Sequence, residues 1–160
     1  VAADPALCRG CDACRLACSL RHEGQCGFEL SRIEVSKDFV TAEFVPNVCR
    51  QCQGPECMFA CPVKDAMYVD SATGARVVDE ARCIGCGLCV KACQFNAIKL
   101  DRHKKVAFNC DLCGGAPECV EVCPTGALSY PDWKQWSFRH DRGLVSPGSP
   151  AKNPRTAHVC

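Results

Sequence analysis

Sixteen of the eighteen cysteines in this 160-residue chain fall into four closely spaced runs. The first and third runs have the spacing C-x2-C-x2-C-x3-C, with which bacterial proteins hold [4Fe–4S] clusters through thiolate sulfur. The second and fourth runs keep the first and last intervals but widen the middle one. The pattern predicts four [4Fe–4S] clusters, which exchange single electrons. The predicted ligands are Cys8, Cys11, Cys14, Cys18, Cys49, Cys52, Cys57, Cys61, Cys83, Cys86, Cys89, Cys93, Cys110, Cys113, Cys119 and Cys123.

Zinc sites and disulfide bonds are the two other common uses of closely spaced cysteines. Structural zinc sites usually combine two separated C-x2-4-C pairs, whereas three cysteines of each compact run lie within seven residues. Disulfide bonds need an oxidising compartment, and no apolar signal segment is visible near Val1. Iron–sulfur clusters are therefore favoured, with a zinc-loaded or empty site left open for one diverged run.

The apolar residues available for a core are few. Leu, Ile, Val and Phe make up 34 of the 160 residues, close to the range in which chains struggle to fold. Because metal ligation also supplies folding free energy, the cluster-free chain is expected to be largely unfolded. The formal charge is +1 with neutral thiols, and four thiolate-bound clusters would bring it to roughly −7. No long basic run indicates a nucleic-acid partner.

Short strands and helices are predicted between the cysteines. Apolar segments beside turn residues predict β-hairpins in the pairs 33–35 with 42–45, 68–69 with 76–78, and 98–100 with 106–108. The third cysteine of each run is expected to open a short helix, because x3 spacing places it and the fourth on one helical face.

The composition changes after about residue 130, where Pro, Gly and Ser become frequent. Trp133 and Trp136 lie at the start of this segment. Because Trp and Arg often anchor interfaces, residues 131–160 are predicted to form an extended, partner-binding tail.

Over about residues 7–130 the four runs resemble the four-cluster ferredoxin-like subunits of molybdenum and tungsten oxidoreductases. A finer likeness lies in CRLACSLRHEG at 14–24 and SRIEV at 31–35. These segments are similar to the small subunits of tungsten aldehyde oxidoreductase and benzoyl-CoA reductase complexes, and to the carbon monoxide dehydrogenase-associated ferredoxin.

The resemblance implies an α+β fold of two interleaved bacterial-ferredoxin-like units within residues 1–130. The outer unit would take about 1–30 and 104–130, and the inner unit about 45–103, with a hairpin insertion at about 31–45. It also implies that each cluster takes its fourth ligand from another run. The implied sets are Cys8/Cys11/Cys14/Cys123, Cys110/Cys113/Cys119/Cys18, Cys49/Cys52/Cys57/Cys93 and Cys83/Cys86/Cys89/Cys61.

Outside the four runs, Cys26, Cys160 and the histidines have side chains that can bind metal but lack the spacing of ligands. Cys26 and Cys160 are left over from the four runs and are expected to be free surface thiols. His22 is expected to lie at the surface or beside a cluster rather than to bind metal.

The expected function is that of a non-catalytic electron-transfer subunit in an anaerobic cytoplasm. The resemblance implies transfer between a tungsten or molybdenum pterin subunit, of the aldehyde oxidoreductase type, and ferredoxin or a flavin subunit. The sequence contains no Walker loop, G-x-S-x-G or G-x-G-x-x-G motif, and no stretch approaching the ~20 apolar residues of a membrane helix. A free-standing polyferredoxin, or a carrier for a formate, carbon monoxide or hydrogenase system, is the alternative. Self-association through exposed end clusters is a further hypothesis.

Overall fold

The computed structural model describes residues 1–131, so the predicted tail beyond Pro131, with Cys160, lies outside the described residues. The described part of the chain forms four α-helices, two 3-10 helices and four two-stranded antiparallel sheets. The helices are η1 (Pro5–Leu7), α1 (Ala13–Glu23), α2 (Glu56–Phe59), α3 (Leu88–Ala92), η2 (Leu112–Gly115) and α4 (Glu118–Glu121). The strands are β1 (Ala2–Ala3), β2 (Ile33–Asp38), β3 (Glu43–Val48), β4 (Met67–Val69), β5 (Arg76–Val78), β6 (Lys99–Asp101), β7 (Val106–Phe108) and β8 (Leu128–Ser129).

The three predicted hairpins are confirmed as β2–β3, β4–β5 and β6–β7. An aspartate stabilises the turn of each one. Asp38 accepts hydrogen bonds from the backbone N–H groups of Val40 and Thr41 at 2.8 and 3.2 Å. Asp70 and Asp101 accept the corresponding bonds in the other two turns. Aspartate is favoured there because its short carboxylate reaches the backbone two or three residues ahead.

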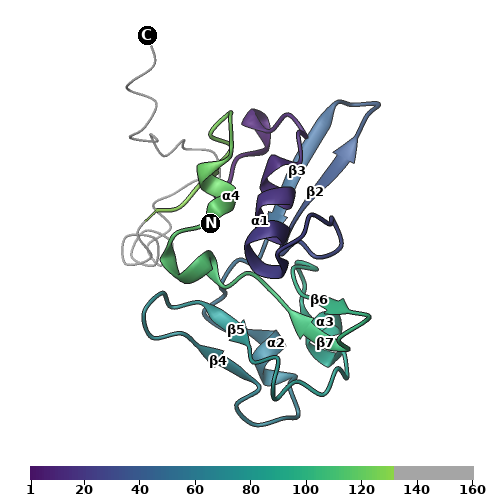
Figure 1. Cartoon of the computed structure of the whole chain (residues 1–160), viewed down its shortest axis with the longest axis vertical. Coiled ribbons are helices and arrows are strands. Elements are labelled where there is room, and N and C mark those ends of the chain that lie inside the picture. Colours follow the sequence, from purple (N-terminus) through teal and green to yellow (C-terminus); the bar gives the residue numbers. More distant parts are fainter. Residues whose placement is uncertain (132–160) are drawn as a thin grey trace.

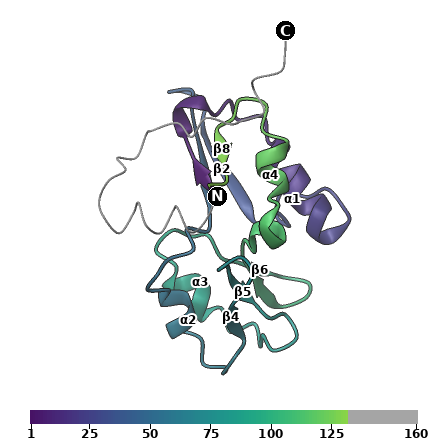
Figure 2. The same cartoon turned by 90° about the vertical axis from the view of Figure 1, so that its left-hand side faces the viewer.

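The elements form two lobes, which Figures 1 and 2 show one above the other. The upper lobe contains α1, α4 and the β2–β3 hairpin, and the lower lobe contains α2, α3 and the two shorter hairpins. Helix α1 packs against α4, and α2 packs against α3. The pairing of β1 with β8 joins the two ends of the described chain, with Ala2 opposite Ser129. The upper lobe is thus built from both ends of the described chain and the lower lobe from its middle.

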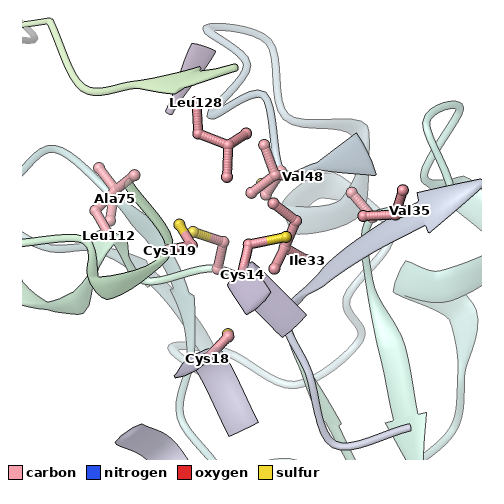
Figure 3. Packing of buried hydrophobic residues seen from close by; sticks show 12 residues of the cluster. Cys14, Cys18, Ile33, Val35, Val48, Ala75, Leu112, Cys119 and Leu128 are labelled. Atoms are coloured by element: carbon pink, nitrogen blue, oxygen red, sulfur yellow. The ribbon is translucent and has the colours of Figure 1, made fainter. Parts of the chain in front are cut away.

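Cysteines make up a large part of the buried core. One cluster of buried residues surrounds Ile33, which is 1% exposed, and includes Cys14, Cys18 and Cys119 (Figure 3). A second, smaller cluster in the lower lobe contains Met67, Val78, Ile98 and Ala107 around Cys89. The architecture is the predicted α+β fold of short helices and hairpins of ferredoxin type.

Candidate metal centres

The C-x2-C loop of every run makes the same backbone turn. The residue directly before the second cysteine has a left-handed φ in all four runs, with values of 65° at Gly10, 51° at Gln51, 68° at Gly85 and 60° at Leu112. Such residues occur in turns whose backbone N–H groups form anion-binding concavities. The compact and expanded runs therefore turn at the same position, although in the fourth run Cys113 also has a left-handed φ, of 50°.

A short α-helix begins one residue before the third cysteine of every run. The fourth cysteine lies four positions further on, inside α1 for Cys18 but just beyond the end of the shorter helix in the other three runs. Where two such helices pack together, the third thiol of each run lies near the fourth thiol of the other. The pairs α1–α4 and α2–α3 have this relationship, with Cys14 near Cys123 and Cys57 near Cys93.

The sixteen thiols gather in four groups, each with three thiols from one run and the fourth from another. Within each group the thiol of the third cysteine of the run interacts electrostatically with the other three. We number the groups site 1 (Cys8, Cys11, Cys14, Cys123), site 2 (Cys110, Cys113, Cys119, Cys18), site 3 (Cys49, Cys52, Cys57, Cys93) and site 4 (Cys83, Cys86, Cys89, Cys61). The four thiols of site 1 line one cavity and those of site 4 line another. The grouping follows the sets implied by the resemblance; cluster binding itself stays a prediction.

Burial makes seven of the sixteen thiols harder to ionise without a metal. Burial, with the charge of neighbouring cysteines, raises the pKa of Cys14 and of Cys57 to about 11. Burial raises the pKa of Cys110 to about 12. The pKa of Cys123 shifts the other way. Hydrogen bonds from Leu128, Thr125 and Ala127 outweigh the effect of burial and lower this pKa. Four thiolates this close need a cationic centre, and thiolate is the ligand of iron–sulfur clusters.

Backbone N–H groups from residues outside the four runs also donate to the sulfur atoms of Cys18, Cys93 and Cys83. Arg32 donates to Sγ of Cys18 at 3.2 Å, Ala97 to Cys93 at 3.3 Å and Ala107 to Cys83 at 3.3 Å. Hydrogen bonds of this kind favour the thiolate form and tune cluster potentials. The donor set thus fits [4Fe–4S] clusters.

His22 lies beside site 2 rather than at the surface. Its side chain is 11% exposed, and its Nε2 is 3.5 Å from Sγ of Cys113 and 3.4 Å from a carboxylate oxygen of Asp111. Burial, and then the charge of Arg32, lower the pKa of His22. Of the two positions that the sequence left open for this residue, the structure favours the one beside a metal centre.

Two amide side chains, which the sequence did not single out, connect sites 2 and 3. Asn109 lies 3.8 Å from Sγ of Cys49 through its Nδ2, which also donates to the carbonyl of Arg76 at 2.6 Å. Gln51 donates to the carbonyl of Cys110 at 2.7 Å. Gln51 occupies a variable position of the second run and Asn109 directly precedes the fourth, so only the three-dimensional path of the chain reveals these contacts.

Two further expectations concern the surface. Cys26 is an exposed free thiol, as expected. Among residues 1–131, no helix has the length and apolar character required to cross a membrane.

Two family models and several known proteins are similar in sequence to this chain. The model of the 4Fe-4S dicluster domain matches residues 40–132, and that of a 4Fe-4S binding domain matches residues 5–24. The polyferredoxin-like subunit of aliphatic sulfonate oxidoreductase from Pyrococcus furiosus is 46% identical over 119 residues, which cover 74% of this chain and 68% of the relative. The thiosulfate reductase electron transfer subunit PhsB of Salmonella typhi is 35% identical over 140 residues, which cover 79% of this chain and 72% of that relative.

A solved chain from the benzoyl-CoA reductase complex BamBC aligns with a TM-score of 0.47 and 23% identity, over 89% of this chain and 87% of that one. The family is shown by the domain match, which spans more than half of the chain, and by the 46% identical relative. The chain belongs to the 4Fe-4S dicluster domain family.

Proposed function

We propose that this protein is the electron-transfer subunit of an oxidoreductase complex and carries one [4Fe–4S] cluster at each of its four thiol sites. The observation that carries the proposal is the gathering of sixteen thiols into four complete groups of four. When bound, the clusters supply one-electron redox chemistry. The protein supplies the thiolates, the N–H donors and the burial that hold them apart from water.

Contacts link the four sites in series. Sites 1 and 2 share helices α1 and α4, and sites 3 and 4 share α2 and α3. Cys110 of site 2 interacts electrostatically with Cys49 of site 3, which joins the two halves. The sequence of sites 1, 2, 3 and 4 therefore offers one continuous route through the molecule. This arrangement supports the two interleaved units, an outer one with sites 1 and 2 and an inner one with sites 3 and 4.

The partner at one end of this route is proposed to be a tungsten or molybdenum pterin subunit of the aldehyde oxidoreductase type. The partner at the other end is ferredoxin or a flavin subunit. The proposal is supported by the RHEG and SRIEV segments and by relatives named as subunits of aliphatic sulfonate oxidoreductase and thiosulfate reductase. Those names also support a non-catalytic role.

Anaerobic purification of the chain from its native host, with metals counted in the complex, tests the assignment. Iron together with tungsten would support the proposed partner. Iron with molybdenum or nickel would keep the electron-transfer role and move it to a formate, sulfur-compound or carbon monoxide system. Iron in a lone small species would favour a free polyferredoxin, and zinc without iron would overturn the proposal.

A further inference from the structure

A buried group of polar side chains surrounds one edge of site 2. The side chain of Arg32 is 12% exposed, and its Nη1 lies 3.3 Å from Oδ2 of Asp111 and contacts Nδ1 of His22. Its Nη2 is 3.7 Å from a carboxylate oxygen of Glu80. Its Nε has no hydrogen-bond partner among the described residues. A permanent cation is thus held in a largely enclosed position.

The same group touches two of the four thiols of site 2. The backbone N–H of Arg32 donates to Sγ of Cys18 at 3.2 Å. Asp111 accepts a hydrogen bond from the backbone N–H of Cys113 at 3.0 Å, and His22 lies 3.5 Å from the sulfur of Cys113. Arg32 is therefore linked to Cys18 directly and to Cys113 through Asp111 and His22.

The ligand types of His22, Asp111 and Cys113 would also suit a separate metal ion, since their ligand atoms lie within 4.8 Å of one another. The guanidinium of Arg32 contacts two of these three residues. The fixed positive charge of this guanidinium therefore opposes the binding of a metal cation by the same residues. The charged side chains of Arg32 and Asp111 are better placed to change the electrostatic potential at site 2 than to bind an ion of their own.

We propose that Arg32 and Asp111 tune the reduction potential of the cluster at site 2 in opposite directions. The inference rests on the proposed function, because it requires a cluster at that site. Reduction adds one electron, passed from a neighbouring site, and hence one negative charge. The guanidinium stabilises that charge and the carboxylate opposes it. Partial burial keeps both effects from being screened as they would be in water.

The test is a redox titration, followed by electron paramagnetic resonance, of the anaerobically purified protein and its variants. The signal of site 2 is the one altered in Cys119→Ser. Arg32→Gln should make the midpoint potential of the cluster at site 2 more negative. The expected change is roughly tenfold in the reduction equilibrium, which is about 59 mV for one electron. Asp111→Asn should make this potential more positive, and the double variant should lie close to the unmodified protein.

Two further variants separate charge from structure. Arg32→Lys keeps the positive charge and should retain most of the original potential. Arg102→Gln removes an exposed arginine in the turn between β6 and β7. It should leave the midpoint potential at site 2 unchanged. If Arg32→Gln does not retain its clusters, the test rests on Asp111→Asn, in which the midpoint potential at site 2 should become more positive.

Unchanged potentials in variants that keep their iron, or shifts of Arg32→Gln and Asp111→Asn in the same direction, would overturn the tuning and leave the electron-transfer role intact. An unmodified protein that shows no iron–sulfur signal would instead overturn the proposed function, and the inference with it.

Discussion

Each fourth cysteine contributes to a different site from the three that precede it. Cys93 closes the third run in sequence but lies with Cys49, Cys52 and Cys57 in space. Replacing Cys93 by Ser should therefore alter the spectrum of the cluster at site 3 and leave that of site 4 unchanged. Electron paramagnetic resonance of the reduced protein distinguishes the two.

Cys26→Ser provides the matched control for Cys93→Ser, because Cys26 is exposed and belongs to no group. It should leave all cluster signals unchanged. Loss of the site 4 signal in Cys93→Ser, with site 3 intact, would show that each run binds its own cluster.

The thiol pKa values predict how the cluster-free chain responds to pH. Burial raises the pKa of Cys14 and of Cys57 from 9.0 to about 11. A raised pKa in the folded state adds stability below the unfolded value, and this stability is lost as the pH rises through the folded value. Any folded structure left after iron removal should therefore decline between about pH 9 and 11. Circular dichroism measures this, and a gain of structure over that range would contradict the shifts.

The sequence was sufficient to select the sixteen cysteines, because their spacing is local. It was not sufficient to select their polar partners. Arg32 meets Asp111 across 79 positions, and Asn109 approaches Cys49 across 60. Such contacts depend on how the lobes fold together, which no short motif encodes.

At the scale of the structural elements, the loop that contains Gly85 has no room for a side chain at that position. An added Cβ at Gly85 would lie 2.0 Å from the carbonyl oxygen of Lys105, whereas at Gly87 it would meet nothing within 4 Å. Both glycines have a left-handed φ, of 68° and 71°, so alanine strains both by a similar amount. Gly85→Ala should displace the chain beside Cys83 and reduce the iron content by about one cluster of four.

Gly87→Ala should keep its full iron content, since it carries the backbone strain without the collision. Iron and sulfide analysis of the two purified variants gives the comparison. Equal iron contents would contradict the steric account.

Strand β2 carries the largest fully buried side chain of the upper lobe. Ile33 is 1% exposed and packs in the same cluster as Cys14 and Leu128 (Figure 3). Ile33→Ala should destabilise the protein by about 2–5 kcal/mol, because it removes buried methyl groups and leaves a cavity. The change appears as a lower guanidinium midpoint for bleaching of the cluster absorbance.

Val40→Ala is the control for Ile33→Ala, since Val40 is 96% exposed in the turn that follows β2. It should leave the midpoint unchanged. Similar losses in the two variants would mean that the upper lobe is not packed around Ile33.

The three hairpins were predictable because alternating apolar residues and turn residues are local signals. The β2–β3 hairpin is longer than predicted, with pairing from Ile33 opposite Val48 to Asp38 opposite Glu43. Helix α1 is also longer than the short helix expected, because no glycine or proline interrupts it before Gly24, which caps it with a φ of 68°. The β1–β8 pair was missed, since two-residue strands leave no periodic pattern.

At the scale of the whole molecule, the thiol sites and the core occupy the same volume. Cys14, Cys18, Cys49, Cys110 and Cys119 are members of the main buried cluster. The aliphatic residues around them are few for a chain of this length. Cluster ligation is therefore expected to be part of folding, which explains why a low apolar content is compatible with a defined structure.

The most direct test of four linked sites is the amount of iron and acid-labile sulfide in the chain, purified without oxygen and with its concentration set by amino-acid analysis. Four [4Fe–4S] clusters require about sixteen iron and sixteen sulfide per chain. A value near eight of each, or zinc in place of iron, would contradict a continuous route through all four sites.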